Sequence, residues 1–255
     1  MNSLFDLRGK VALITGASSG LGRHFAGVLS RAGARVGLAA RRVDALETAA
    51  AELSAGGAVT GIARLDLYDE ESITSAIATI EQLLGPIDIL VNNAGVCITK
   101  PVLEQTARDW DEVLDVNLRG AFLMSTHVAR RMRELKRGGS IINIQSILSY
   151  RQAGHIAPYA ASKAALNQLT KSMALELARF NIRVNGIAPG YFLTDINRDF
   201  FATEAGAAMV KRIPQRRLGR FEDLDGPLLL LASDASRYMT GSTIVVDGGH
   251  LCSNL

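Results

Sequence analysis

A tyrosine and a lysine stand four residues apart in the run Tyr159-Ala-Ala-Ser-Lys163. Within a helix, residues at this spacing share one face. An ammonium beside a phenol favours the phenolate, so we expect Lys163 to lower the pKa of Tyr159. Such a phenol could give a proton to an oxygen that gains negative charge, or take it back. Because most pairs at this spacing lie on a solvated surface, the spacing alone leaves both interpretations open.

The serine at position 146 follows a run of apolar residues that we expect to form a strand. Its hydroxyl could hold a substrate oxygen beside the phenol of Tyr159. The ordinary alternative is a cap or turn residue. A hydride acceptor such as a ketone carbon would need the hydride from a cofactor, with the protein supplying position and electrostatics.

A glycine-rich turn precedes the first expected helix, in the order Thr15-Gly16-Ala17-Ser18-Ser19-Gly20-Leu21-Gly22. Glycines allow a sharp turn and a close approach to a pyrophosphate, and the start of a helix offers it unpaired N–H groups. The spacing is G-x-x-x-G-x-G. Glycines also gather in loops for conformational reasons, so it is the position between a strand and a helix that favours a dinucleotide site.

Two arginines end the second expected strand, at Arg41 and Arg42, and Ala40 stands where an acidic residue would bind ribose hydroxyls. A guanidinium at this place can bind a 2′-phosphate through charge-assisted hydrogen bonds. We therefore expect NADP(H) to be favoured over NAD(H), with Arg41 as the main determinant and Arg42 as its assistant. Solvated strand-end arginines are the alternative.

Short apolar runs alternate with longer amphipathic ones along the whole chain. Runs that are continuously apolar are typical of strands buried on both faces, and strict alternation with helices indicates a parallel sheet. We expect strands at 11–14, 35–40, 59–65, 87–91, 140–145, 182–187 and 242–246, and helices at 20–31, 44–53, 69–84, 107–135, 159–180 and 222–232.

These elements predict the α/β class, with residues 1–255 forming a single doubly wound Rossmann-type domain. Its seven-stranded parallel sheet should carry helices on both faces. The long stretch at about 190–221 holds only a short helical pattern at 195–212. Since ligands of such sheets bind outside the carboxyl ends of the strands, we expect this stretch to be a substrate lid.

The composition is that of an ordinary globular protein, with 48% hydrophobic residues and a formal charge of +3. This mild charge does not favour nucleic acid, and no apolar run reaches the roughly 18 residues of a membrane span. Cys97 and Cys252 lie far apart and the four histidines show no metal-ligand spacing, so we expect free thiols, no metal and a cytoplasmic protein.

Several motifs in order resemble those of the short-chain dehydrogenase/reductase family, over essentially the whole chain from Lys10 to Gly249. They are Thr15-Gly16-x-x-x-Gly20-x-Gly22, Asn92-Asn93-Ala94-Gly95, Asn117, Ser146, Tyr159-x-x-x-Lys163, Pro189-Gly190 and the closing Val245-Val246-Asp247-Gly248-Gly249. Phe192 stands where the family more often has Ile or Val. The resemblance implies a catalytic group of Asn117, Ser146, Tyr159 and Lys163, in which Asn117 helps to hold a water that connects Lys163 to solvent.

The resemblance also implies the contacts of the cofactor and of the substrate. The implied cofactor residues are Gly16, Ser18, Ser19, Gly20, Leu21, Gly22, Arg41, Arg42, Asp66, Leu67, Asn93, Ala94, Gly95, Tyr159, Lys163, Pro189, Gly190, Phe192 and Thr194. The substrate would contact Ser146, Leu148, Gln152, Tyr159 and Tyr191, with Val96 also at the pocket. By resemblance we expect a homotetramer.

The expected function is an oxidoreductase that interconverts a ketone and a secondary alcohol with NADP(H), Tyr159 being the general acid/base. Because the lid is rather apolar, a generic ketone ranks first. A 3-oxoacyl-thioester reductase ranks second, its acidic carrier or nucleotide docking on Arg198, Lys211, Arg212, Arg216 and Arg217. An NAD-dependent polyol or sugar-acid dehydrogenase ranks third. A nucleotide-sensing protein without turnover is the remote alternative, since fold alone does not settle function.

Overall fold

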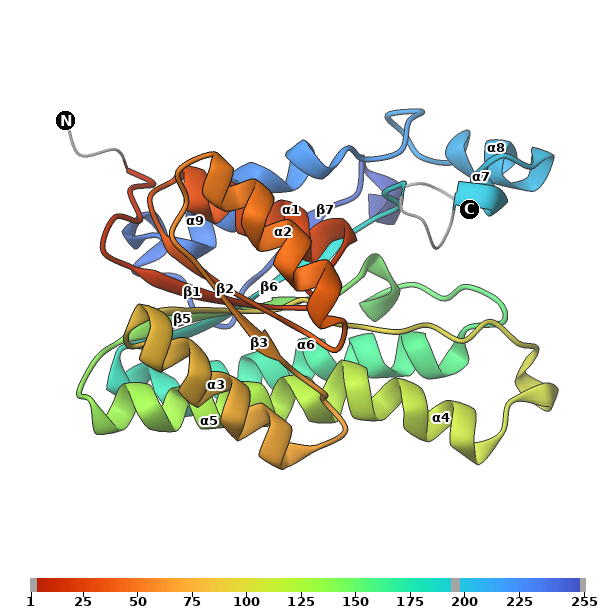
Figure 1. The fold of residues 1–255 in the computed structure, drawn as a ribbon. Helices are drawn as coiled ribbons and strands as arrows, with labels where there is room; N and C mark the ends of the chain where they lie inside the picture. Colours follow the sequence, from red (N-terminus) through yellow and green to blue (C-terminus); the bar gives the residue numbers. More distant parts are fainter. Residues whose placement is uncertain (1–3, 194–197, 253–255) are drawn as a thin grey trace.

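The computed structural model describes residues 4–193 and 198–252 of the chain. Within these residues one parallel sheet of seven strands has the order β3-β2-β1-β4-β5-β6-β7. This is the doubly wound α/β architecture expected from the sequence (Figure 1). The strands are β1 (Val11–Thr15), β2 (Arg35–Ala40), β3 (Thr60–Arg64), β4 (Ile89–Asn92), β5 (Gly139–Ile144), β6 (Ile182–Pro189) and β7 (Thr243–Val246).

Helices cover both faces of the sheet because the central strands are apolar on both sides. Every residue of β1 is buried, and two apolar clusters lie on opposite faces of it, one containing Ile14 and the other Leu13. In Figure 1, helices α1 (Gly20–Arg31), α2 (Val43–Ala55) and α9 (Asp225–Ala232) lie on one face, and α3 (Glu70–Leu84), α4 (Ala107–Leu114), α5 (Ala121–Glu134) and α6 (Ala157–Leu177) lie on the other.

The strand order reverses between β1 and β4, which are neighbours in the sheet although two strands separate them in sequence. At such a switch point the two following loops diverge to opposite faces, and a crevice opens beyond the carboxyl ends of the strands. The glycine-rich turn after β1 and the Asn93–Gly95 segment after β4 therefore meet at the same edge.

The helix expected at 107–135 is interrupted in the structure. A π-helical turn, Asp115–Gly120, separates α4 from α5. Such turns insert an extra residue and often occur at functional sites. Here the turn carries the buried side chain of Asn117, and it brings Gly120 so close to Leu67 that an added Cβ would lie 2.8 Å from the Leu67 Cβ.

The expected lid contains two short helices, α7 (Arg198–Phe201) and α8 (Glu204–Val210), where the sequence predicted one helical pattern at 195–212. A single bridge, Phe192 to Gly219, joins its two arms in the described part. The helix expected at 222–232 begins at Asp225, after a 3-10 turn from Phe221 to Leu224. Among the helices of the described residues, none is long and apolar enough to cross a membrane.

Candidate active site

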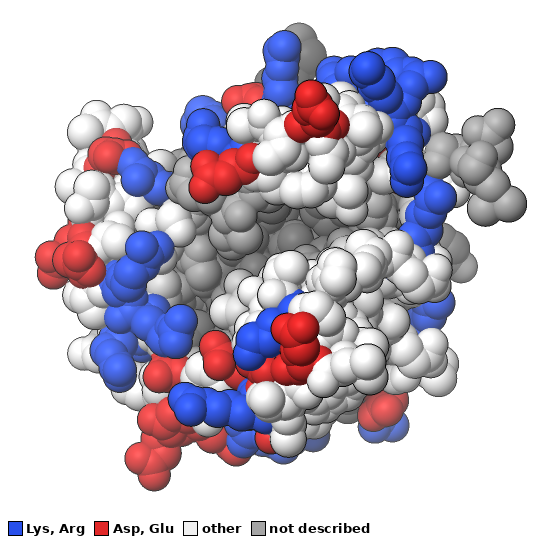
Figure 2. All heavy atoms as spheres, turned by 90° about the vertical axis from the view of Figure 1, so that its right-hand side faces the viewer, with Lys and Arg blue, Asp and Glu red and all other residues white. Residues whose placement is uncertain are grey.

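A cleft of about 580 Å³ opens at the carboxyl ends of the strands, and Figure 2 shows this end of the molecule hollowed, with Lys and Arg side chains on parts of its rim. Most of the expected cofactor and catalytic residues line it together. They are Gly16, Ser18, Ser19, Gly20, Leu21, Arg41, Arg42, Asp66, Leu67, Asn93, Ala94, Gly95, Val96, Ser146, Tyr159, Lys163, Pro189, Gly190 and Phe192.

Five expected residues do not line this cleft. Gly22 and Asn117 contact residues of its wall, Gly16 and Val96. The other three are Leu148, Gln152 and Tyr191, of which Tyr191 contacts Phe201 of the lid. Thr194 lies outside the described residues. Sequence reasoning missed several lining residues because no motif marks them: Ala40, Leu65, Tyr68, Cys97, Val116, Ile144 and Gln145.

The glycine-rich turn is held by the segment that follows β4. Thr15 Oγ1 accepts hydrogen bonds from the main-chain N–H groups of Asn93 and Ala94, both at 3.0 Å, and Asn93 Nδ2 donates to the Thr15 carbonyl at 2.9 Å. A Cβ on Gly22 would lie 2.4 Å from the Gly16 carbonyl oxygen, so only glycine permits this approach.

The surface that the turn offers to the cleft suits a dinucleotide pyrophosphate. Gly16 and Gly20 have positive φ of +68° and +53°, and a Cβ added to Gly20 would meet nothing within 4 Å. The first turn of α1, which begins at Gly20, contains no acidic residue. A ligand can approach the main chain here without meeting a side chain, and the amino end of α1 begins at the same turn. This is the arrangement that binds phosphate anions.

The two arginines after β2 both border the cleft but make different contacts. Arg42 Nη2 donates to Ser18 Oγ at 3.1 Å and to Ser19 Oγ at 3.0 Å, so that it cross-links the glycine-rich turn to β2. Arg41 lies on the cleft with Tyr68, whose phenol donates to the Glu112 carbonyl at 3.2 Å. A phosphate beside Ser18 would therefore meet the Arg42 guanidinium, and Arg41 borders the same cleft.

The side chains of Ser146, Tyr159 and Lys163 converge at the other end of the cleft. Lys163 is only 4% exposed; its Nζ donates to the Ile144 carbonyl at 2.8 Å and lies 5.6 Å from the centre of the Tyr159 ring. Ser146 begins the turn after β5, where its Oγ accepts a hydrogen bond from the Leu148 N–H at 3.1 Å. Helix α6 thus brings the Tyr-Lys pair against the end of β5, which removes it from an ordinary solvated surface.

The protonation of this pair differs from the expectation that Lys163 lowers the pKa of Tyr159. Burial raises the pKa of Tyr159 to about 12, and the hydrogen bond with Ser146 lowers it by less. Burial also lowers the pKa of Lys163 to about 8. The physical reason is that desolvation disfavours both charged forms, while Lys163 Nζ bonds a main-chain carbonyl and stands over the ring instead of at the phenol oxygen.

The side chain of Asn117 is fixed behind the Tyr159-Lys163 pair. Its Oδ1 accepts from the Val96 N–H at 2.8 Å, and its Nδ2 donates to the Val96 carbonyl at 2.9 Å and to Ser162 Oγ at 3.1 Å. A Cβ on Gly95 would lie 3.2 Å from Asn117 Oδ1 and 3.6 Å from Lys163 Nζ. Gly95 therefore keeps space open between the amide and the ammonium.

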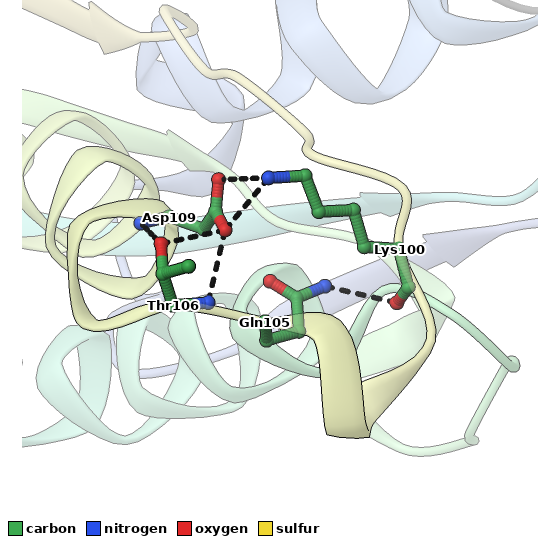
Figure 3. A network of polar contacts seen from close by, with 4 residues as sticks. All are labelled: Lys100, Gln105, Thr106 and Asp109. Carbon is green, nitrogen blue, oxygen red and sulfur yellow. Dashed lines mark hydrogen bonds and ion pairs between the residues drawn. The ribbon is translucent and has the colours of Figure 1, made fainter.

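A polar network fixes the loop that carries Cys97 along the cleft wall (Figure 3). Lys100 Nζ bonds both carboxylate oxygens of Asp109, at 2.7 and 2.8 Å, and Asp109 forms a capping box with Thr106 at the start of α4. These contacts hold the pKa of Asp109 near 2. The Lys100 N–H also donates to the His155 carbonyl at 2.8 Å, which ties this loop to the one before α6.

The remaining expected substrate residues differ in burial. Leu148 is buried, Gln152 is exposed, and Tyr191 is half-buried with its ring 5.7 Å from that of Phe201 in α7. His155 is exposed. No group of three or more potential metal ligands occurs in residues 4–193 and 198–252.

The sequence profile of a known family, described as Enoyl-(Acyl carrier protein) reductase, matches residues 16–250. The chain belongs to the short-chain dehydrogenase/reductase family. Relatives within this family include a gluconate 5-dehydrogenase of Gluconobacter oxydans, 40% identical over 248 residues and covering 96% of both chains. A 5-keto-D-gluconate 5-reductase of Escherichia coli K12 is 41% identical over 252 residues, or 98% of this chain and 99% of the relative.

A solved short-chain dehydrogenase/reductase structure has nearly the same fold. It is a gluconate 5-dehydrogenase from Burkholderia cenocepacia in complex with NADP and tartrate, with 38% identity, a TM-score of 0.94 and coverage of 98% of each chain. These three relatives are dehydrogenases and reductases named for gluconate or keto-gluconate, and this chain is an oxidoreductase.

Proposed function

We propose that the chain interconverts a ketone and a secondary alcohol on a sugar acid of the gluconate type, with NADP(H) as cofactor. The observation that carries the proposal is that Ser146, Tyr159 and Lys163 converge in the same cleft as the glycine-rich turn. The relatives' names favour the sugar acid, which the sequence alone ranked third. We now place it above the generic ketone.

In the proposed reaction, bound NADP(H) supplies or accepts the hydride. The phenol of Tyr159, protonated at neutral pH because its pKa is about 12, gives its proton to the carbonyl oxygen during reduction. Ser146 donates a hydrogen bond to the same oxygen and holds it beside the phenol. The ammonium of Lys163 is the positive charge nearest to the tyrosinate that results. Asn117 would help to hold a water that connects Lys163 to solvent.

The preference for NADP(H) rests on Arg41 and Arg42. The 2′-phosphate would lie against Ser18, where Arg42 already bonds the hydroxyl, and Arg41 would face it from the strand end. The related enzyme from Burkholderia cenocepacia binds NADP. Asp66 and Leu67 would contact the adenine, and Asn93, Ala94 and Gly95 the ribose below it. Pro189, Gly190 and Phe192 would border the nicotinamide.

Residues 190–221 form the proposed lid, and Leu148, Gln152 and Tyr191 the proposed substrate contacts. The rival 3-oxoacyl-thioester reductase needs a basic docking surface on this lid. Arg217, one of its five candidate cations, is already bound by both oxygens of Asp223, at 2.6 and 3.2 Å. This engagement weakens the rival proposal. A homotetramer and a cytoplasmic location stay predictions, the first tested by analytical ultracentrifugation.

The direct test is reduction of 5-keto-D-gluconate by the purified protein with NADPH, followed by the loss of absorbance of the reduced nicotinamide. Tyr159→Phe removes the proton donor and keeps the ring, so we expect kcat to fall by roughly 10²- to 10⁴-fold. NADPH binding should stay within a few-fold. Full activity of this variant would contradict the mechanism. If neither the wild type nor the variant reduced 5-keto-D-gluconate, the proposed substrate would be wrong.

A further inference from the structure

A buried glutamine stands directly before the serine that holds the substrate oxygen in the proposed reaction. Gln145 follows the last residue of β5, and only 2% of its surface is exposed. Its main-chain N–H donates to the Ile187 carbonyl of β6 at 2.8 Å, which keeps this point of the chain attached to the sheet. Gln145 borders the cleft, but the proton transfer proposed above gives it no role.

The side-chain amide of Gln145 links β5 to a helix and to another strand. Its Nε2 donates to Thr170 Oγ1 of α6 at 3.0 Å, and its Oε1 accepts from Thr243 Oγ1 of β7 at 3.2 Å. Thr243 Oγ1 also lies 3.3 Å from Asn167 Oδ1 of α6. The amide passes over Gly186 of β6, where an added Cβ would lie 2.3 Å from Nε2. A larger residue at position 186 would displace the amide, so this link across β6 depends on a glycine.

Helix α6 runs along one face of the sheet (Figure 1), and two of its buried side chains bond the end of β5. Lys163 Nζ donates to the Ile144 carbonyl at 2.8 Å. Thr170, two helical turns later on the same face, accepts from Asn143 Nδ2 at 2.9 Å as well as from Gln145. These contacts at two levels fix both the rotation of α6 and its position along β5.

The partners of the Gln145 amide also determine which way it points. Thr170 gives its hydroxyl proton to the Leu166 carbonyl at 2.8 Å, so its oxygen can only accept hydrogen bonds from β5. A flipped amide would bring Oε1 against that oxygen, and it would leave a buried N–H₂ and a buried carbonyl without their partners. Because unpaired buried polar groups are costly, the amide is held in one orientation.

We propose that Gln145 is a positioning residue, which keeps the end of β5 in register with α6 so that the Ser146 hydroxyl stays beside the phenol of Tyr159. The inference rests on the proposed reaction. Ser146 follows β5 and Tyr159 lies in α6, so their relative position depends on contacts between these two elements. A displacement of about 1 Å from the productive arrangement can lower a rate by roughly 10²-fold.

The other end of β5 provides a comparison for a role in stability alone. Ser140 Oγ donates to the Leu231 carbonyl at 2.7 Å, and Ser140 is 2% exposed, as Gln145 is. Ser140 does not line the cleft and makes this bond to α9 on the opposite face of the sheet. Loss of either buried hydrogen bond should lower stability, whereas only loss of the Gln145 contacts should alter the reaction.

The test is a double-mutant cycle between Gln145 and Ser146. We would measure kcat and KM for 5-keto-D-gluconate with saturating NADPH in the full-length wild type, Gln145→Met, Ser146→Ala and the double variant. Methionine keeps the length of the side chain and removes both hydrogen-bonding groups. Ser140→Ala is the matched control, because it removes one buried hydrogen bond from the same strand.

Gln145→Met should lower kcat by roughly 10- to 100-fold and leave KM and the Kd for NADPH within a few-fold, because the Ser146 hydroxyl acts mainly in the transition state. Ser146→Ala should itself lower kcat by roughly 10²- to 10³-fold. In that background Gln145→Met should lower kcat further by less than about threefold, because the group that it misplaces is already absent. Ser140→Ala should melt at a lower temperature and keep the kcat of the wild type.

An equal fold-loss of kcat from Gln145→Met in both backgrounds would overturn the positioning role while the proposed reaction stands. An unchanged kcat in the single variant would do the same. A wild type that does not reduce 5-keto-D-gluconate would overturn the proposed function and this inference with it.

If Gln145→Met does not fold, two substitutions of Thr243 decide the matter. Thr243→Val removes the hydroxyl that donates to Gln145 Oε1 at nearly constant shape, and Thr243→Ser keeps that hydroxyl. The valine variant should lose kcat several-fold, and the serine variant should stay within about twofold of the wild type. Equal kcat values in these two variants would refute the proposal.

Discussion

Removing the guanidinium of Arg41 should weaken NADPH binding and leave NADH binding unchanged. Arg41 borders the cleft and is exposed, and we propose that it contacts only the 2′-phosphate, which NADH lacks. A hydrogen bond to a charged group contributes about 1.5–3 kcal/mol, and an exposed pair lies at the lower end. A loss of about 1.5 kcal/mol corresponds to a roughly tenfold higher Kd for NADPH in Arg41→Ala.

Arg42 should behave differently because it already bonds Ser18 and Ser19, at 3.1 and 3.0 Å. Arg42→Ala removes a phosphate contact and also the cross-link that fixes the glycine-rich turn. We therefore expect a higher Kd for both nucleotides, with the larger increase for NADPH. The double variant should lose less than the sum of the two, since neighbouring sites that share a ligand couple.

The assay is a titration of nucleotide fluorescence with NADPH and, separately, with NADH. Arg108→Ala, which removes an exposed arginine from α4, is the matched control for loss of one positive charge. If Arg41→Ala weakened NADH as much as NADPH, Arg41 would not be a phosphate ligand. Tighter binding of NADH than of NADPH by the wild type would refute the cofactor assignment itself.

Three further predictions concern the turn, the phenol and the cleft wall. Gly22→Ala should abolish measurable NADPH binding and lower the melting temperature, because the added Cβ would lie 2.4 Å from the Gly16 carbonyl oxygen. If the variant kept its affinity for NADPH, the close approach of Gly22 to Gly16 would not be required for cofactor binding. The rate of ketone reduction should be constant up to neutral pH and fall above about pH 8, where Lys163 loses its proton. The rate of alcohol oxidation should rise with pH as Tyr159 ionises. A reduction rate that rises above pH 8 would contradict these assignments. Asp109→Asn should lower the melting temperature at neutral pH. The difference from wild type should shrink as the pH falls from roughly 4 through 2, because a carboxyl with a depressed pKa stabilises the fold only while it is ionised. A difference as large at pH 2 as at pH 7 would argue against the ion pair with Lys100.

The alternation of strands and helices along the chain and the class of the fold could be predicted from the sequence alone. Apolar runs such as Val11–Thr15 are continuous because both faces of the sheet are covered, and this local pattern needs no tertiary information. The cluster of Ser146, Tyr159 and Lys163 could be expected as well. Parallel strands bring their carboxyl ends to one edge, so motifs that follow different strands meet there.

Only the tertiary structure decided features that depend on contacts between distant segments. The helix expected at 107–135 contains a π-helical turn because Asn117 bonds the main chain of Val96 and Gly120 packs against Leu67. The pKa of Tyr159 is raised instead of lowered, since desolvation is a property of the folded environment.

The segments after β5, β6 and β7 show the same limit. Arg151 Nη1 donates to the His250 carbonyl, and the His250 ring lies 5.6 Å from the ring of Tyr191, although these residues lie far apart along the chain. Nothing in the spacing of these residues predicts their contact. Local periodicity determines which elements form, whereas long-range packing determines which side chains share a site and what charge each of them carries.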